Sequence, residues 1–377
     1  MEILSGFVGY ALPFLVVLTV LVFVHEMGHY LVARWCGVDV EVFSIGFGRE
    51  IFGFNDKSGT RWRLSMIPFG GYVKFAGDAG AASEMVPDLE SIPEEKRGGI
   101  FHFKPLHQRA AVVAAGPLAN FLFAIVVFAI MFATIGRPYT PPVVDQVMEG
   151  SVAEAAGFRK GDRIVEISGK PIERFEDIQN VVRLNLGEPL EFVVLRDGAR
   201  VTLPATPRVV EMTDRFGNVY RVGQLGIAVM ARDYAVLSPL KAVAAAVEQT
   251  YSVTATTLGA VGQMITGTRS SDELRGPLGI VQLSGQAAQV GVASVIQFMA
   301  FLSISLGLIN LFPVPMLDGG HLLFYAIEAV RGKPLGEKSM EYGFRVGLAL
   351  ILALMVFATW NDLVQFRIVD AVRSFFS

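Results

Sequence analysis

The sequence predicts a polytopic α-helical membrane protein with about four transmembrane helices and an additional α+β region outside the bilayer. Hydrophobic residues make up 52% of the 377 residues and charged residues 18%. An average soluble domain is about 45–50% apolar and about 25% charged. Four apolar runs approach or exceed the ~20 residues that a helix needs to cross a bilayer. A long and less apolar segment, 137–289, separates the second run from the third.

The four expected spans differ in length and content. The first is not a cleavable signal peptide, since its apolar run is too long and contains His and Glu residues. The fourth is short and needs its flanking aromatic residues at the membrane interface. The runs are 7–35, 110–135, 290–312 and 344–360.

A fifth stretch, 240–265, is ambiguous. It is rich in Ala and Thr and also carries Lys241, Glu248 and two glutamines. We expect an amphipathic or interfacial helix here, because a polar face suits the membrane surface. A fifth membrane span is the alternative.

Lysines and arginines set the expected orientation. They gather in the loop between the first two spans and in the loop between the last two, and such loops face the cytoplasm. Both termini and segment 137–289 would then lie in the periplasm. The loop residues are Arg49, Lys57, Arg61, Arg63, Lys74, Lys96, Arg97, Lys104 and Arg109, and later Arg331, Lys333, Lys338 and Arg345.

Net charge and cysteine content limit the possible functions. A net charge of −3 gives no argument for a nucleic-acid partner. The single cysteine, Cys36, allows neither an intrachain disulfide nor a thiolate zinc cage. Any metal must therefore be held by His, Asp or Glu.

The first expected span contains a His-Glu-x-x-His motif at residues 25–29. Residues four apart share one face of a helix, so His25 and His29 can direct imidazole nitrogens at one ion. Glu26 can act as general base on a water that zinc has made more acidic. The alternative is a chance pentapeptide on a buried helix. Each ionisable residue inside a bilayer is unfavourable by about 2.5 kcal/mol or more unless it is satisfied, so we expect a metal site.

Asp318 is the candidate for a third protein ligand. It follows two prolines near the end of the third expected span, where irregular backbone is tolerated only if it is buried or lines a wet cavity. A helix cap beside a Gly-rich turn is the alternative interpretation. The first and third spans both run from outside to inside, so Asp318 reaches the level of the two histidines. A fifth span at 240–265 would place it on the opposite face.

This ordered set of motifs resembles the site-2 proteases, the M50-type intramembrane zinc metalloproteases. It is most similar to their bacterial regulator-of-sigma-E protease (RseP) group. The resemblance covers nearly the whole chain. It rests on His-Glu-x-x-His, Phe-Ser-Ile-Gly-Phe-Gly at 43–48, Ile-Pro-Phe-Gly-Gly-Tyr-Val-Lys at 67–74, Ala-Gly-Pro-Leu-Ala-Asn at 115–120 and Asn-x-x-Pro-x-Pro-x-Leu-Asp-Gly at 310–319.

The resemblance implies an enzyme of a bacterial inner membrane that uses Zn²⁺. It implies zinc held by His25, His29 and Asp318, with Glu26 as the catalytic base. Asn310 matches a position that holds the substrate or the developing oxyanion, whereas His321 is not a ligand in the family pattern. Well-known members of the group carry two tandem PDZ domains, and this chain has room for one. It is therefore similar to a shorter, single-PDZ branch.

Segment 38–76 contains two predicted strands, 62–67 and 72–75, with tight turns at the Gly46/Gly48 and Gly70/Gly71 pairs. The resemblance makes this a β-hairpin sheet that dips into the membrane near the zinc. A strand edge beside Gly70 and Gly71 could hold an unwound substrate by β-addition. A surface hairpin that seals the cytoplasmic face is the alternative.

Segment 142–207 resembles a bacterial PDZ domain. Ser-Val-Ala-Glu-Ala-Ala-Gly-Phe at 151–158 and Lys-Gly-Asp-Arg-Ile-Val-Glu-Ile at 160–167 carry the likeness, and Asp197-Gly198 predicts a terminal hairpin turn. PDZ domains bind extended peptides or free C-termini by strand addition. Gly226 lies in a stretch, 224–227, that resembles the carboxylate-binding loop.

These interpretations divide the chain into seven parts. They are 1–36, first span with the histidines; 37–109, cytoplasmic-side β-hairpin and amphipathic loop; 110–136, second span; 137–232, periplasmic PDZ-like domain; 233–289, amphipathic helical linker; 290–321, third span with Asp318; and 322–377, cytoplasmic loop, fourth span and tail.

The expected function is zinc-dependent endopeptidase cleavage within transmembrane segments of single-pass proteins whose periplasmic part has already been trimmed. The resemblance implies anti-sigma-factor-type substrates and, as a further duty, remnant signal peptides. The expected partners are such a substrate, a peptide or C-terminus on the PDZ-like domain, and the lipid bilayer. The alternatives are a non-catalytic PDZ membrane scaffold and a metal transporter. The substrate's identity, the upstream protease and the oligomeric state stay open.

Overall fold

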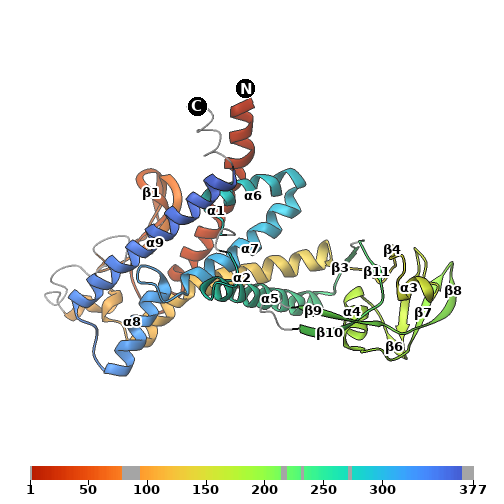
Figure 1. The fold of residues 1–377 in the computed structure, drawn as a ribbon. Coiled ribbons are helices and arrows are strands. Elements are labelled where there is room, and N and C mark those ends of the chain that lie inside the picture. Colours follow the sequence, from red (N-terminus) through yellow and green to blue (C-terminus); the bar gives the residue numbers. More distant parts are fainter. Residues whose placement is uncertain (1, 79–93, 214–218, 231–232, 271–273, 367–377) are drawn as a thin grey trace, which may run out of the picture. The chain divides into compact units, whose positions relative to one another are not determined.

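The computed structural model describes residues 2–78, 94–213, 219–230, 233–270 and 274–366 (Figure 1). The chain divides into two compact units. Unit 1 comprises residues 1–129 and 243–377, and unit 2 comprises residues 130–242. The boundaries fall inside two helices, so each unit is described separately below.

Four helices among the described residues are long and apolar enough to cross a membrane, as the sequence predicted. They are α1 (Glu2–Trp35), α2 (Leu106–Thr134), α7 (Val292–Asn310) and α9 (Glu337–Gln365). The fourth is longer than the predicted 344–360 at both ends. Their outward faces carry exposed leucine, valine and isoleucine side chains, which suits a lipid environment. The chain is a multi-pass membrane protein.

Three more helices complete unit 1. Helix α5 (Pro239–Ile265) has nearly the bounds predicted for the fifth stretch, and its hydropathy does not place it among the candidate spans. Helix α6 (Pro277–Val290) begins with a proline in its first turn, where the missing N–H costs nothing. Helix α8 (Asp318–Arg331) ends at Gly332, whose φ of 69° suits a left-handed C-cap.

The third span is shorter than predicted. Helix α7 ends at Asn310, and an irregular turn connects it to α8. Asp318 is therefore the first residue of α8 and does not lie on the spanning helix itself.

The hairpin of unit 1 consists of β1 (Val40–Asn55) and β2 (Arg61–Phe75), followed by short 3₁₀ turns at Glu94–Gly99 and Phe101–Phe103. Both strands bend sharply at the predicted glycines. Ser44 is paired with both Tyr72 and Arg63, and Arg63 is paired in turn with Gly53. Four segments therefore lie side by side, in the order 50–55, 61–65, 42–45 and 71–75. The segment at 71–75 is one edge of this sheet.

Unit 2 contains a four-stranded antiparallel sheet in the order β6-β5-β7-β8, with helix α4 (Phe175–Leu184) and the short helix α3 (Val152–Ala155). The sheet strands are β5 (Arg163–Ile167), β6 (Lys170–Pro171), β7 (Leu190–Arg196) and β8 (Ala199–Ala205). Three two-stranded pairs accompany it: β3 (Arg137–Tyr139) with β12 (Asp233–Ala235), β4 (Gln146–Val147) with β11 (Ile227–Ala228), and β9 (Arg208–Thr213) with β10 (Val219–Gln224).

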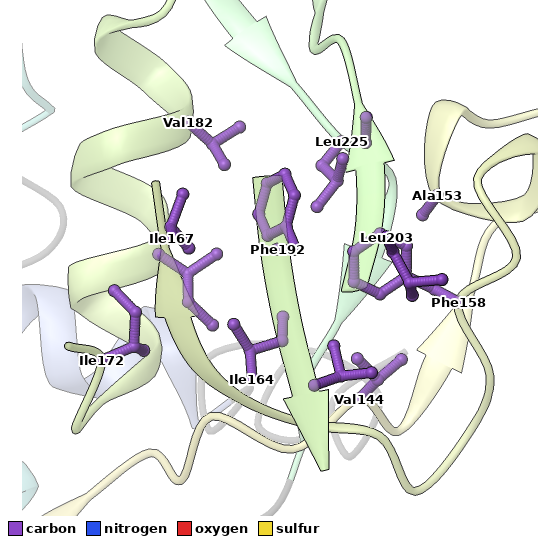
Figure 2. Close-up of a cluster of buried hydrophobic side chains, with 13 residues drawn as sticks. Val144, Ala153, Phe158, Ile164, Ile167, Ile172, Val182, Phe192, Leu203 and Leu225 are labelled. Carbon is purple, nitrogen blue, oxygen red and sulfur yellow. The ribbon is translucent and has the colours of Figure 1, made fainter. Parts of the chain in front are cut away.

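The core of unit 2 lies between this sheet and α4 (Figure 2). Phe192 is fully buried and meets Phe158 edge to face, with ring centroids 5.4 Å apart. An ion pair with a buried carboxylate borders the core: Asp162 accepts hydrogen bonds from the Arg196 guanidinium at 2.7 and 2.8 Å. The predicted turn at Asp197-Gly198 joins β7 to β8.

Candidate metal centre

Three side chains from two distant parts of the chain converge in unit 1. The Nε2 atoms of His25 and His29 are 3.2 Å apart, as expected for residues one helical turn apart on α1. Asp318 Oδ2 lies 3.2 Å from the first nitrogen and 3.6 Å from the second. Among the described residues this is the one group of three or more His, Cys, Asp or Glu side chains placed to hold a metal.

The spacing of these three atoms fits a zinc ion. Zinc bonds of 2.0–2.1 Å in a tetrahedron put neighbouring ligand atoms ~3.3 Å apart, close to the three distances observed. Asp318 Oδ2 is buried without a hydrogen-bond partner among the described residues. A buried carboxylate oxygen is costly to leave unpaired, and a bound cation would satisfy it. Three protein ligands also leave a fourth position open, as catalytic zinc sites do.

His29 is held by helix α2. Its Nδ1 lies 2.9 Å from the carbonyl oxygen of Val112, and an Nδ1–H donated there leaves Nε2 free as a ligand. Gly116, one turn further along α2, provides the space for the ring. A Cβ at this position would lie 2.2 Å from His29 Nε2. Close approach of α1 and α2 is possible because small residues line their contact, including Gly28 and Ala115.

Asp318 is positioned by the tight turn between α7 and α8. Added Cβ atoms at Gly319 and Gly320 would lie 2.3 and 2.4 Å from carbonyl oxygens of that turn. Helix α9 packs on the other side of the turn through Gly347. A Cβ added at Gly347 would lie 2.0 Å from the Pro315 carbonyl oxygen. The carboxylate also occupies the first turn of α8, where the helix dipole favours a negative charge.

Glu26 connects the cluster to the edge of the sheet. It is close enough to interact electrostatically with His25, His29 and Asp318, and the Val73 backbone gives its carboxylate a hydrogen bond. Gly71 packs against the same stretch of α1, because its added Cβ would lie 3.2 Å from Glu26 Cγ. The sheet edge at 71–75 therefore lies beside the candidate base.

The other predicted site residues lie in different places. Gly70 has a φ of 112° and packs against the Phe47 ring, so it shapes the turn before the edge segment. Asn310 is the last residue of α7, at the start of the turn that leads to Asp318. His321 is outside the metal cluster. His102 pairs with the buried Asp78 at 2.9 Å.

Gly226 is far along the chain from this cluster and belongs to unit 2. It lines a groove between α4 and the strands β10 and β11, together with Ile178, Arg183 and Leu225. Glycine is required at this position for two reasons. Its φ is 91°, and a Cβ added here would lie only 2.2 Å from Ser151 Cβ.

Three features of α2 that contact the cluster were not predicted from the sequence: the Val112 carbonyl, Gly116 and Asn120. Asn120 is fully buried, and its side-chain nitrogen lies 3.2 Å from His25 Nδ1. A polar side chain in an apolar span was a usable signal, because polar groups inside a membrane must find partners. The Val112 carbonyl had no such signal, since any residue carries one.

Comparison with known proteins agrees with this geometry. The family model described as peptidase family M50 matches residues 13–354. The Agrobacterium fabrum protein named "Putative zinc metalloprotease Atu1380" is 49% identical over 365 residues, covering 95% of this chain and 97% of its own. Metalloprotease MmpA of Caulobacter vibrioides is 40% identical over 398 residues, covering 99% of this chain and all of its own (100%).

Solved structures are similar to part of the chain. One of them is the PDZ domain of an SdrC-like protein from Listeria innocua, with 18% identity, 25% of this chain and 99% of that chain covered, and a TM-score of 0.20.

The family match spans most of the chain and includes both the histidine pair and Asp318, and relatives that match nearly end to end are named as zinc metalloproteases. The chain belongs to peptidase family M50, the site-2 protease family of zinc-dependent metalloproteases.

Proposed function

We propose that this protein is an intramembrane endopeptidase that cleaves transmembrane segments of single-pass membrane proteins after their outer part has been trimmed. The observation that carries the proposal is the cluster of His25, His29 and Asp318 beside Glu26, built from α1 and the first turn of α8. Because the site is assembled on membrane-spanning helices, its expected substrates are proteins that can reach it through the bilayer.

In this proposal the His25 and His29 Nε2 atoms and Asp318 Oδ2 hold zinc. Bound zinc supplies Lewis acidity, which polarises a scissile carbonyl and makes a water more acidic. Glu26 takes the proton from that water and delivers it to the leaving amine, a role worth about 10²–10⁴-fold in rate. Asn310 is proposed to bind the substrate near the developing oxyanion.

The sheet edge at 71–75 is proposed to hold the substrate in an extended form. A transmembrane helix protects its peptide bonds by internal hydrogen bonds, so it must unwind locally before a carbonyl becomes accessible. An edge strand offers backbone groups to such an unwound segment. Gly70 and Gly71 bend the chain into this edge beside Glu26, which supports the proposal.

The groove containing Gly226 is proposed to bind the new C-terminus or an extended peptide of the trimmed substrate. Anti-sigma-factor-type membrane proteins and remnant signal peptides are the proposed substrates. We further propose a bacterial inner membrane, with unit 2 and both termini in the periplasm and the cluster towards the cytoplasmic side, from the lysine and arginine distribution.

The test uses the full-length protein in detergent and a single-pass substrate that lacks its periplasmic domain. Glu26→Gln keeps the three ligands but removes the base, and Glu341→Gln is the matched control at an exposed position of α9. Peptide products are identified by mass spectrometry and zinc by elemental analysis. We expect wild type and Glu341→Gln to cut within the membrane segment. Glu26→Gln should hold zinc and cut at least 100-fold more slowly, on the scale of general-base catalysis.

Two results would contradict the proposal. Zinc-loaded wild type that cuts no trimmed substrate would favour a non-catalytic scaffold. Normal cleavage by Glu26→Gln would remove that residue from the mechanism.

A further inference from the structure

The two histidines of the cluster have different partners behind them. His29 Nδ1 faces a backbone carbonyl oxygen, which can only accept a hydrogen bond. His25 Nδ1 faces the side-chain amide of Asn120 on α2, at 3.2 Å from the atom placed as Nδ2. The ring of His29 is therefore fixed by the main chain, whereas that of His25 depends on a side chain.

The Asn120 side chain has no other described hydrogen-bond partner. Its Oδ1 is buried and lacks a donor within the described parts of the chain. The hydrogen bond that its residue does make uses the backbone: Ser303 Oγ on α7 donates to the Asn120 carbonyl oxygen at 2.8 Å. Helix α7 also packs tightly on this residue, since a Cβ added at Gly307 would lie 3.2 Å from Asn120 Cβ. The amide is thus confined next to His25.

Ligation by His25 fixes which end of the amide can face the ring. His25 directs Nε2 at His29 and Asp318, so a metal there takes the Nε2 lone pair and the ring proton must reside on Nδ1. An Nδ1–H needs an acceptor, and an amide NH₂ has only donors. A half-turn of the amide exchanges its oxygen and nitrogen at almost the same positions. That turn places Oδ1 where it can accept from Nδ1–H.

We propose that Asn120 is a positioning residue for the metal site, whose amide oxygen accepts the His25 Nδ1–H and so holds the Nε2 lone pair towards the ion. This inference rests on the proposed function only in taking His25, His29 and Asp318 as the zinc ligands. Asn120 touches neither substrate nor the reacting atoms, and acts through the ring that it orients. Partners of this kind change metal affinity by about 10–100-fold when they are removed.

Three variants of the full-length protein in detergent test the proposal. Asn120→Asp keeps an acceptor oxygen at the same place, Asn120→Leu keeps the approximate volume without an acceptor, and Ser303→Ala removes the hydrogen bond to the Asn120 backbone only. Zinc affinity is measured by competition with a chelator series, and thermal unfolding of the zinc-free proteins is followed in parallel. We expect Asn120→Leu to bind zinc about 10–100-fold more weakly. The zinc affinities of Asn120→Asp and Ser303→Ala should remain within about threefold of the wild-type value, because both variants keep the acceptor oxygen.

The outcomes separate the two possible failures. Wild-type zinc affinity in a folded Asn120→Leu protein would overturn the role of Asn120 and leave the ligand assignment intact. Weaker binding by Asn120→Asp than by Asn120→Leu would also overturn it, because a residue that only packs the helices should tolerate leucine better than a buried charge. A His29→Ala protein that retains tight zinc binding would instead overturn the ligand set, and with it this inference.

Discussion

The two units of this protein differ in where their polar and apolar side chains lie. In unit 1, the spanning helices expose apolar side chains and bury polar ones such as His29, Asn120 and Ser303. In unit 2, the main buried cluster consists of aliphatic and aromatic side chains between a sheet and a helix (Figure 2), with Asp162 as a buried polar residue beside it. In unit 1, the candidate functional residues are therefore found among the buried polar side chains. In unit 2, the candidate binding groove lies at the surface.

The comparison predicts that a very small change in unit 1 has the largest effect on metal binding. Gly116→Ala places a methyl group 2.2 Å from His29 Nε2, so the ring must move away from its position in the cluster. We expect zinc affinity and cleavage activity to fall together, on the order of 100-fold, because the displaced atom is one of the proposed zinc ligands. Chelator competition and the cleavage assay measure the two effects.

Gly259→Ala on α5 is the matched control, since an added Cβ there meets no described atom within 4 Å. It should leave both quantities unchanged. Unaltered zinc binding in Gly116→Ala would show that His29 is not held where it is described here.

A core truncation in unit 2 should have a large effect on stability and none on metal binding. Phe192→Ala removes a fully buried ring, and such changes destabilise by about 3–5 kcal/mol. We expect a lower urea midpoint for unit 2, measured by pulse proteolysis of the full-length protein, with zinc content as in wild type. Leu184→Ala, at a position 84% exposed, should shift stability by no more than about 0.5 kcal/mol. Loss of zinc from Phe192→Ala would contradict the separation of the two units.

The buried carboxylate of unit 2 predicts the smallest effect, a dependence of stability on pH. Burial of Asp162 acts to raise its pKa, but hydrogen bonds from Arg196 and from the Arg159 backbone outweigh burial, and the pKa is lowered. A lowered folded-state pKa stabilises unit 2 above the unfolded value, about 3.9, and this contribution is lost as pH falls through the folded-state pKa.

The stability of unit 2 should accordingly decrease on acidification below about pH 4, and less steeply in Asp162→Asn. Urea midpoints taken across this pH range, with a protease active at each pH, measure the slope. Equal slopes in the two proteins would mean that the Asp162–Arg196 pair does not govern the response.

Much of unit 1 could be predicted because membrane helices have a strong sequence signal. The four spans and the bounds of α5 follow from apolar runs, and the bends at Gly46, Gly48 and Gly70 follow from glycine's tolerance of positive φ. The helix at Asp318–Arg331 was not predicted, because the two prolines and the glycine pair around Asp318 indicate a turn. The predicted third span continued to residue 321, so Asp318 was assigned to that span and not to α8.

The proximity of His25, His29 and Asp318 could be anticipated from motif order, but the supports behind them could not. Val112 acts through its backbone carbonyl and Gly116 through the absence of a side chain. Neither role can be predicted from the residue type alone. In unit 2, the groove around Gly226 depends on how β11 pairs with β4, a contact between segments about 80 residues apart. Such long-range pairings leave no local pattern.

The position of Asp318 has a consequence for biosynthesis. About 290 residues separate it from His29. Because ribosomes add ~5–20 residues per second, the two histidines are synthesised about 15–60 s before Asp318. Throughout that interval the nascent chain carries only part of the proposed ligand set. During translation, neighbouring membrane proteins therefore meet a chain that lacks the third proposed ligand, and the proposed site can form only once translation is nearly finished.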